Sequence, residues 1–309
     1  MARVVMVLSE NWTVVSPRDL PALVELAVVA EAAGVDTVML SEHVVLGPSA
    51  GAAGRMRNPR DYAAPGNQDP DTPWPDSIVL AAAIAARTTT LRVALAAIIA
   101  PLRHPLLLAK QLATLDLVAG GRLVVQPTVS WAEEEYAALG VPFAQRGAIL
   151  DEQLAAMRAA WTQSPAAFAG QHFSFRDVYC APRPFHAGGP RMWFGGQSLH
   201  PALLRRIVRY GSGFHPFGTP TDADLGRLAE AMRAAGRDVS ELEMVGGIRG
   251  RFDAPDALAD LDEALADVPA QLARGFESIC FKPSMYTDDP AEVPELCRRV
   301  VELMAEAAA

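Results

Sequence analysis

Histidine side chains stand directly after segments of this 309-residue chain that have the apolar composition of buried strands. His43 follows residues 37–40, and His215 closes a later segment of the same kind. An imidazole exchanges a proton near neutral pH, so a histidine at a strand end is suited to general acid or base catalysis. The alternative for His43 is that it anchors the loop that follows. We take His43 as the candidate catalytic residue and place His215 in the candidate substrate pocket.

A glycine pair after another predicted strand is typical of an anion site. The strand at 191–194 runs into Gly195, Gly196, Gln197 and Ser198, and a helix is predicted to begin shortly afterwards. Glycines allow close backbone approach, amides at a helix N-terminus attract anions, and a serine hydroxyl adds a donor. The motif therefore predicts a site for a phosphate or another anion. The alternative is an ordinary tight turn.

Polar groups also follow the predicted strand at residues 122–126. The side chains of Gln126 and Thr128 can hydrogen-bond a heteroaromatic ring, and Trp131 can form one wall of its pocket. The alternative is that Trp131 fills the core at the end of the strand. We assign Gln126, Thr128 and Trp131 to cofactor binding. The acidic run at 133–135, in contrast, predicts a solvated helix face.

Three further residues are candidates for the substrate pocket. Lys282 ends the last predicted strand, where it can pair with an anionic group of a substrate, and Trp12 lies in the first strand-to-helix turn. His104 stands with Arg103 before Pro105, at the end of a long apolar strand. The alternative for this Arg-His pair is that it braces the helix that Pro105 begins.

Composition excludes several classes of function. The formal net charge of −9 and the pI near 5.2 argue against nucleic acid as the main partner. No apolar run is long enough to span a membrane, and the first residues lack the features of a signal peptide. The three cysteines are an odd number without metal-ligand spacing, which indicates reduced thiols and a cytoplasmic protein.

The chemistry is therefore expected to come from a bound organic cofactor. The six histidines are scattered, so no metal site is predicted, and neither a P-loop nor a Gly-x-Ser-x-Gly nucleophile motif occurs. The cofactor would supply the reaction, and the protein would orient it against a small-molecule substrate.

These residues are positioned by eight strand-like segments, each followed by a helical pattern. The repeat predicts an α/β fold, a (β/α)8 TIM barrel that forms one domain over residues 1–309. An open doubly wound sheet fits less well, because residues 8–12 lack its Gly-rich first turn. Strands are predicted at residues 4–8, 37–40, 92–99, 122–126, 191–194, 213–215, 243–249 and 278–282. Helices are clearest at residues 21–33, 105–117, 148–162, 202–210, 222–235 and 294–307.

Two insertions, after strands 2 and 4, interrupt the repeat. Residues 44–75 are rich in Gly, Pro, Ala and Arg, which predicts a mobile loop over the mouth of the barrel. Residues 163–190 are too many for a simple connection, and we expect them to form a long loop with a short hairpin around residues 168–175. Loops at this end of a barrel commonly form lids and select substrates.

In their order and spacing, the motifs resemble the luciferase-like flavin and deazaflavin oxidoreductases, the bacterial-luciferase superfamily. The resemblance covers nearly the whole chain and favours the branch that uses coenzyme F-420. The matching segments are Ser41–His43, Pro73–Asp76, Pro101–Pro105, Leu139–Phe143, Arg146, Ala181–Pro184, Trp193–Gly196 and Gly213–Pro216.

The resemblance implies a flavin-type ring at the carboxyl ends of the strands, with its phosphate near Gly195–Ser198. It also implies a catalytic histidine at the position of His43. Family members carry a non-proline cis peptide at the end of the third strand, and the matching bond is Ala97–Ile98. Ala97 and Ile98 therefore join the predicted cofactor-binding residues. A homodimer is implied in the same way.

This chain departs from the family pattern after the fourth strand. Where the family usually has Gly-x-Gly-x-Gly, the sequence is Gln126-Pro-Thr-Val-Ser130, so side chains fill space normally left for backbone approach. The glutamate acid of the deazaflavin sugar-phosphate dehydrogenases is replaced by Trp131. Sugar-phosphate oxidation is therefore not expected.

The resulting prediction is a coenzyme F-420-dependent oxidoreductase that transfers hydride between the deazaflavin and a small organic substrate. The alternative within the family is an FMN-dependent monooxygenase that uses O2 and reduced flavin, with a separate flavin or deazaflavin reductase as partner. A third alternative, of a different class, is a non-catalytic barrel that has lost cofactor binding. The Gln126-Pro127 pair favours this last alternative, whereas His43 and the glycine pair oppose it.

Overall fold

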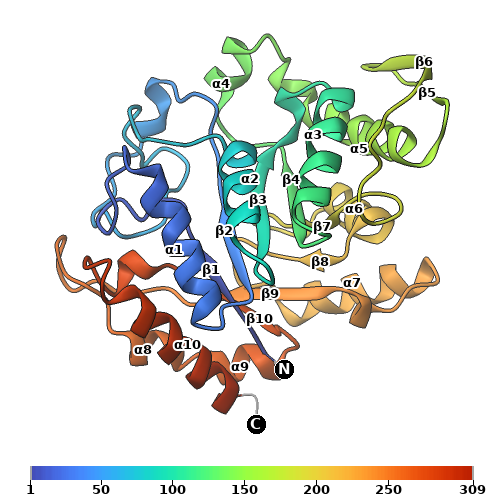
Figure 1. Cartoon of the computed structure of the whole chain (residues 1–309). Coiled ribbons are helices and arrows are strands. Elements are labelled where there is room, and N and C mark those ends of the chain that lie inside the picture. The colour runs from blue at the N-terminus through green and yellow to red at the C-terminus, as the bar shows by residue number, and fades with distance from the viewer. Residues whose placement is uncertain (1, 308–309) are drawn as a thin grey trace.

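The computed structural model describes residues 2–307; residues 1, 308 and 309 of the predicted barrel lie outside it. Eight parallel strands close into a barrel in the order β1-β10-β9-β8-β7-β4-β3-β2, which confirms the predicted fold (Figure 1). The barrel strands are β1 (Arg3–Val7), β2 (Thr37–Leu40), β3 (Arg92–Ile99), β4 (Leu123–Thr128), β7 (Arg191–Phe194), β8 (Gly213–Phe214), β9 (Glu243–Gly247) and β10 (Ser278–Phe281).

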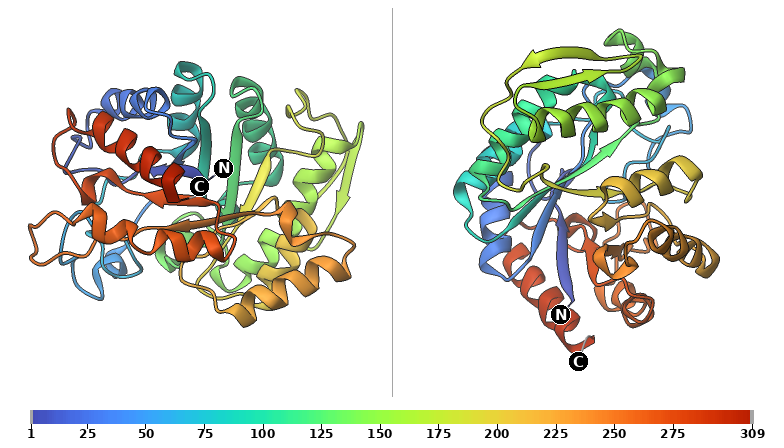
Figure 2. Two further views of the ribbon diagram at one scale, coloured as in Figure 1. Left: turned by 90° about the horizontal axis from the view of Figure 1, so that it is seen from below. Right: turned by 90° about the vertical axis from the view of Figure 1, so that its right-hand side faces the viewer.

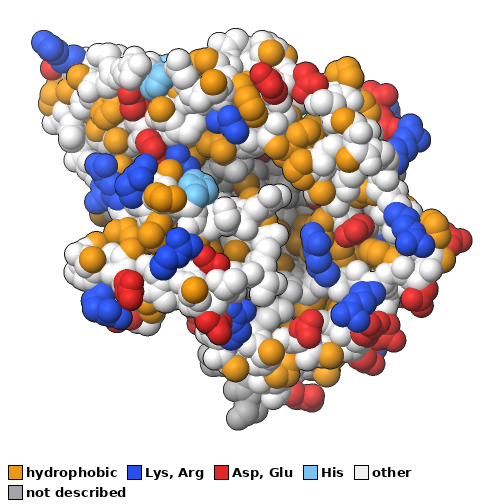
Figure 3. All heavy atoms as spheres, turned by 180° about the vertical axis from the view of Figure 1, so that it is seen from behind, with side chains coloured by type: hydrophobic (Ala, Val, Ile, Leu, Met, Phe, Trp, Pro, Cys, Tyr) orange, Lys and Arg blue, Asp and Glu red, His pale blue; other side chains and the backbone are white. Residues whose placement is uncertain are grey.

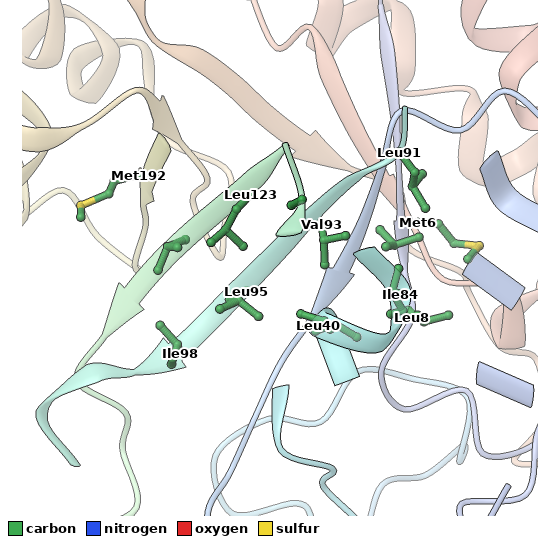
Figure 4. Close-up of a cluster of buried hydrophobic side chains, with 14 of the residues drawn as sticks. Met6, Leu8, Leu40, Ile84, Leu91, Val93, Leu95, Ile98, Leu123 and Met192 are labelled. Atoms are coloured by element: carbon green, nitrogen blue, oxygen red, sulfur yellow. The ribbon is translucent and has the colours of Figure 1, made fainter. Parts of the chain in front are cut away.

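The barrel strands are apolar on both faces because both faces are covered. Inward side chains fill the barrel interior, so it is a packed core and not a channel. Outward side chains such as Leu95 and Ile98 of β3 pack with helix residues such as Ile84 (Figure 4). The inward set is Val5, Val7, Met39, Ala94, Ala96, Val124, Trp193, Val245 and Cys280.

Helices surround the barrel (Figure 2). They are α1 (Leu20–Ala32), α2 (Ser77–Arg87), α3 (Pro105–Val118), α4 (Glu133–Ala138), α5 (Arg146–Thr162), α6 (Pro201–Tyr210), α7 (Asp222–Ala234), α8 (Leu261–Leu265), α9 (Val268–Ala273) and α10 (Val293–Ala307). Side chains at their N-termini satisfy free amides: Asp19 accepts from Ala22 N at 3.2 Å, and Asp76 accepts from Val79 N at 2.9 Å. The six helices predicted most clearly are confirmed to within two residues at each end.

Both predicted insertions are present. The first, residues 44–75, has little regular structure beyond a short 3-10 turn at Pro48–Gly51 and lies beside the carboxyl ends of the strands (Figure 1). The second contains the predicted hairpin, with β5 (Ala166–Ala169) antiparallel to β6 (Ser174–Val178). This hairpin lies on the outside of the barrel against α5 (Figure 2), and Phe173 at its turn packs against His104, which follows β3.

The end of β3 carries the predicted non-proline cis peptide, one residue earlier than expected. The cis bond joins Ala96 to Ala97, so the prediction of Ala97–Ile98 is wrong in position. The register between β3 and β4 shifts at the same place: Ala96 pairs with Gln126, but Ile98 already pairs with Pro127. Ala97 is the extra residue of this bulge and is half-buried, whereas Ile98 is fully buried among the outward-facing residues.

The amino end of the barrel is closed by a buried ionic network. The Arg92 guanidinium donates to both carboxylate oxygens of Glu243, at 2.7 and 2.6 Å, and also to Thr37 Oγ1 at 2.9 Å. The Ser278 hydroxyl donates to the same carboxylate at 2.6 Å. Hydrogen bonds from Arg92 lower the pKa of Glu243 against the opposing effect of burial. This network braces the end of the barrel opposite to the candidate site.

Charged side chains of both signs lie on the surface (Figure 3). Acidic and basic side chains are mixed on the face seen in Figure 3, and neither sign gathers into one patch. Among residues 2–307, no helix has the length and apolar character needed to cross a membrane. Cys180, Cys280 and Cys297 are all buried and free.

Candidate active site

The candidate catalytic histidine lies where three strand ends are tied together. The backbone amide of Ser41, which follows β2, donates a hydrogen bond to Ser9 Oγ at 2.7 Å. Its hydroxyl donates to the carbonyl oxygen of Ala96, at the cis bond, with a separation of 3.2 Å. His43 follows two residues later. The ends of β1, β2 and β3 are therefore fixed relative to one another beside His43.

His43 lines a pocket of about 340 Å³ between the start and the end of the first insertion. Both apolar and polar surface line it: five of the eight lining residues are apolar, and Val44 and Val45 are each 44% exposed. The lining residues are His43, Val44, Val45, Leu46, Pro70, Asp71, Thr72 and Trp74. The insertion thus provides the pocket wall, as expected for a loop at the mouth of a barrel.

The His43 ring is enclosed by two tryptophans and a carboxylate. Trp74 and Trp131 each meet it edge to face, with ring centroids 5.3 and 5.5 Å away. Glu135 Oε2 lies 3.2 Å from His43 Nδ1. The structure therefore brings together His43 and Trp131, which the sequence placed in one site.

Glu135 is a site residue that the sequence analysis missed. The acidic run was predicted to be a solvated face, but the Glu135 side chain is fully buried. Its Oε1 accepts hydrogen bonds from the amides of Val44 and Val45. Glu134, one residue earlier, accepts from the amide and the hydroxyl of Ser49, at 3.2 and 2.6 Å, and these hydrogen bonds lower its pKa. α4 therefore holds the segment after β2 in place.

The Arg-His pair after β3 braces the structure, as in the alternative interpretation. Arg103 donates to both carboxylate oxygens of Glu42, at 2.7 and 3.0 Å, and Glu42 also accepts from the amide of Ile99 at 2.8 Å. His104 is exposed; its Nδ1 caps α3 by accepting from Leu106 N at 3.2 Å. His104 therefore lies apart from the pocket beside His43.

A buried hydrogen-bond chain crosses the interior of the barrel below its mouth. His215 Nδ1 lies 2.8 Å from Gln126 Oε1, and His215 Nε2 lies 3.9 Å from Cys280 Sγ. Burial lowers the pKa of His215 to about 4 and raises that of Cys280 to about 12, so the imidazole is neutral and the thiol protonated at pH 7. Gln126 Nε2 is buried and finds no hydrogen-bond partner among residues 2–307.

The first insertion also reaches over the centre of the barrel. Tyr62 packs on the inward-facing core, and the Lys282 ammonium lies 5.5 Å from the centre of its ring. Lys282 is fully buried and donates to the Asp61 carbonyl oxygen at 2.7 Å, and burial lowers its pKa. Glu10, after β1, accepts from the amide of Ala63 at 2.9 Å, and its pKa is raised because the carboxyl group is buried.

The two glycines after β7 differ in how closely the surrounding atoms approach them. A Cβ on Gly195 would lie 1.7 Å from the His215 carbonyl oxygen, so this glycine is required by the close contact between the chain segments that follow β7 and β8. A Cβ on Gly196 would meet no atom closer than 3.4 Å. Gln197 and Ser198 are exposed, and α6 begins only at residue 201, where the His200 ring accepts from Leu203 N at 3.3 Å.

The remaining predicted residues lie at the mouth or just below it. Thr128 and Trp12 are half-buried, and the indole Nε1 of Trp12 is a buried donor without a partner in the described part of the chain. The buried unpaired donors of Trp12 and Gln126 fit a ligand that offers carbonyl or ring-nitrogen acceptors, as a flavin or deazaflavin ring does. On this ground the residues present fit the implied type of cofactor.

A sequence model of the family described as luciferase-like monooxygenase matches residues 1–260. The chain belongs to this family. Membership of the luciferase-like monooxygenases confirms the superfamily that the motifs predicted. The chain is 34% identical to an FMNH2-dependent dimethylsulfone monooxygenase of Pseudomonas putida over 208 residues, which are 66% of this chain and 56% of that protein. It thus spans about half the length of the curated relatives that it matches first.

Solved structures of other luciferase-like proteins share the fold. A monooxygenase of Streptomyces bottropensis superposes with a TM-score of 0.74 at 21% identity, over 99% of this chain and 100% of the other. The coenzyme F-420-dependent tetrahydromethanopterin reductase of Methanopyrus kandleri superposes with a TM-score of 0.66 at 13% identity, over 97% of this chain and 98% of the other. At these identities the likeness concerns the barrel alone. The chain thus resembles in sequence a protein named for FMNH2, and in fold a protein named for coenzyme F-420.

Proposed function

We propose that this luciferase-like protein is an oxidoreductase that uses coenzyme F-420 to move a hydride to or from a small organic substrate. The observation that carries the proposal is the position of His43, at the edge of a pocket and next to the bulged end of β3. When bound, the deazaflavin would supply the carbon that accepts or donates the hydride. His43 would hold or move the accompanying proton at its Nε2 atom.

The cofactor would be held by groups from several strand ends. Ala97 at the bulge would support the ring, and Ile98 would contribute only its backbone, because its side chain faces the helices. The unpaired amide nitrogen of Gln126 would donate to a ring acceptor. Thr128 and Trp131 would border the ring on the side of β4.

The phosphate tail would bind after β7. Gly196 leaves room for close approach, and the exposed Ser198 hydroxyl and Gln197 carboxamide would donate to phosphate oxygens. Gly195 would contribute only indirectly, by allowing the backbone to pass His215. The tail site is therefore expected to depend on Ser198 and Gln197 more than on Gly195.

The substrate would enter the pocket beside His43. Five of the eight lining residues are apolar, and the ionisable groups of the lining are His43 and Asp71, with no lysine or arginine. Such a lining favours an uncharged molecule with an apolar body and one polar group that reaches His43, and it disfavours carboxylates and phosphates. Lys282, predicted to meet an anionic substrate, is instead bonded to the Asp61 carbonyl.

The second candidate function is an FMN-dependent monooxygenase. The observation that favours it is the 34% identity to a protein named as an FMNH2-dependent monooxygenase. Reduced FMN would supply the electrons for oxygen activation, and a separate reductase would be required as a partner. The same pocket and the same His43 would receive the substrate.

A fluorescence titration with F-420 and FMN, each oxidised and reduced, tests the proposal. We expect micromolar affinity for F-420 and binding of FMN at least about tenfold weaker, which corresponds to about 1.4 kcal/mol. The reverse preference would select the monooxygenase, and binding of neither would favour the non-catalytic barrel. A Ser198→Ala variant should weaken binding of both cofactors, whereas Ser240→Ala, on the exposed turn after α7, serves as the control.

A further inference from the structure

We propose that Glu135 is a positioning residue that sets the tautomer of His43. Its carboxylate fixes the proton of the neutral ring on Nδ1 and leaves Nε2 as the acceptor toward the pocket. The proposal rests on the proposed role of His43, and it concerns an arrangement of protons that exists before any ligand binds.

The contacts of Glu135 determine which ring nitrogen carries the proton. Oε2 faces His43 Nδ1 at 3.2 Å, and Oε1 accepts from the backbone amides of Val44 and Val45. An ionised carboxylate only accepts hydrogen bonds, so the nitrogen that faces it must be the donor. In the neutral ring Nε2 is then unprotonated and able to take a proton.

The surroundings prevent the ring from turning away from this carboxylate. Trp74 and Trp131 meet the ring edge to face at interplanar angles of 68° and 73°. The His43 side chain is 9% exposed, and it lines the pocket. Rotation of the ring would have to displace both indoles and would break its contact with Glu135.

The same carboxylate stabilises the ring when it becomes charged. When Nε2 accepts a proton from a hydroxyl or amine of the substrate, the imidazolium lies against Glu135, as in other carboxylate–histidine pairs. The other ionisable groups around His43 are Glu10, which follows β1, and Asp71 in the pocket lining. No cation from the pocket lining opposes the charged ring.

The neighbouring residue provides a matched control. Glu134 is on the same short helix and holds the same segment after β2, but it does so at Ser49 and has no contact with His43 among those described. If α4 only anchored the loop, Glu134→Gln and Glu135→Gln would have similar effects. If Glu135 determines which nitrogen of His43 carries the proton, only Glu135→Gln would change the tautomer.

The decisive measurement is the nitrogen chemical shifts of His43 in protein labelled with 15N-histidine, without cofactor or substrate. The His43 signals are assigned from a His43→Asn spectrum. We expect a protonated Nδ1 in the wild type and in Glu134→Gln, and a protonated Nε2 in Glu135→Gln, where the amide can donate to Nδ1. A wild-type ring protonated on Nε2, or an unchanged tautomer in Glu135→Gln, would overturn the proposal.

Turnover gives the second readout once the cofactor is known. We expect Glu135→Gln to lower kcat by about 10²–10⁴-fold with KM changed little, because a wrong tautomer removes the proton acceptor. Glu134→Gln should retain kcat within about threefold. A failure of the proposed function would appear as absent cofactor binding in the wild type, and the tautomer measurement would still decide the role of Glu135. If Glu135→Gln does not fold, the wild-type spectrum decides alone.

Discussion

The imidazole of His215 and the carboxamide of Gln126 share a hydrogen bond of 2.8 Å inside the barrel. The two residues lie 89 positions apart in sequence, His215 directly after β8 and Gln126 within β4. Because the carboxamide oxygen of Gln126 can only accept, the neutral imidazole donates its Nδ1–H to this oxygen. The Cys280 thiol lies at the other ring nitrogen. This chain orients the Gln126 amide so that its NH2 group is left free.

The contributions of His215 and Gln126 to stability should be coupled, because each is the hydrogen-bond partner of the other. His215→Phe leaves the Gln126 carbonyl unpaired, and Gln126→Met leaves the His215 N–H unpaired, so each single variant should lose about 1–3 kcal/mol. The double variant should lose less than the sum of the two. Urea unfolding of the four proteins gives the coupling free energy. Strict additivity would show that the bond contributes nothing.

The low pKa of His215 makes stability dependent on pH in a defined range. The folded ring titrates at about 4 and the unfolded ring at about 6.5, so the unfolded chain binds more protons between these values. The contribution of His215 is complete above pH 6.5 and is lost as pH falls toward 4, by up to about 3 kcal/mol. Urea unfolding at pH 7.5 and pH 5 should show this loss in the wild type.

His215→Phe should show a smaller loss over the same pH range, because no buried imidazole has to be charged. An equal slope in His215→Phe and the wild type would contradict the assignment.

The two glycines after β7 should respond differently to alanine. Gly195→Ala places a Cβ against the His215 carbonyl oxygen, so we expect a loss of at least about 3 kcal/mol or failure to fold. Gly196→Ala has space for its methyl group and should change stability by less than about 1 kcal/mol. Thermal unfolding tests the pair. Equal stability of the two variants would mean that the segments after β7 and β8 lie farther apart.

Asn58 connects the middle of the first insertion to the segment at residues 254–257. Its amide donates to the carbonyl oxygens of Ala254 and Ala257, at 3.2 and 2.8 Å. Asn58→Ala removes both hydrogen bonds, and a local loss of about 1.4 kcal/mol would raise cleavage within residues 44–75 about tenfold. Limited proteolysis measures this rate. Arg55→Ala removes only an exposed ion pair with Asp69 and should leave the rate unchanged.

His43→Asn tests catalysis separately from binding. We expect kcat/KM to fall about 10²–10⁴-fold, because Nε2 no longer exchanges the proton, while the Kd of the cofactor stays within about threefold. Steady-state kinetics and the fluorescence titration give the two numbers. Full turnover in this variant would remove His43 from the proposed role.

The barrel could be predicted from local patterns because each strand is apolar on both faces and is followed by a helical repeat. The position of the cis bond depends on how β3 and β4 pair, which no local pattern encodes. Glu135 was missed for a similar reason. A run of three glutamates normally faces solvent, and its burial is caused by a segment 90–92 residues away.

The function of Gly195 was interpreted from a motif that is ambiguous in sequence. Glycines before a helix suit both an anion site and a close contact between neighbouring strands. The contact with His215 requires both strand ends to be placed in space, so only the structure reveals it. His104 is similar, because a histidine before a helical proline can face either a ligand or the helix that it caps.

The hydrogen bonds of the first insertion divide it into two parts, a base that is bonded to the barrel and a tip that is bonded mainly to itself. Its base, residues 58–63, is bonded to Asp288, Lys282 and Glu10 around the barrel. Its tip hydrogen-bonds largely to itself, from Ala53 to Gly66, Met56 to Asn67 and Gln68 to Ala50. Because the pocket-lining residues 43–46, 70–72 and 74 lie outside both parts, exchanging the tip for that of another family member should leave the pocket beside His43 intact.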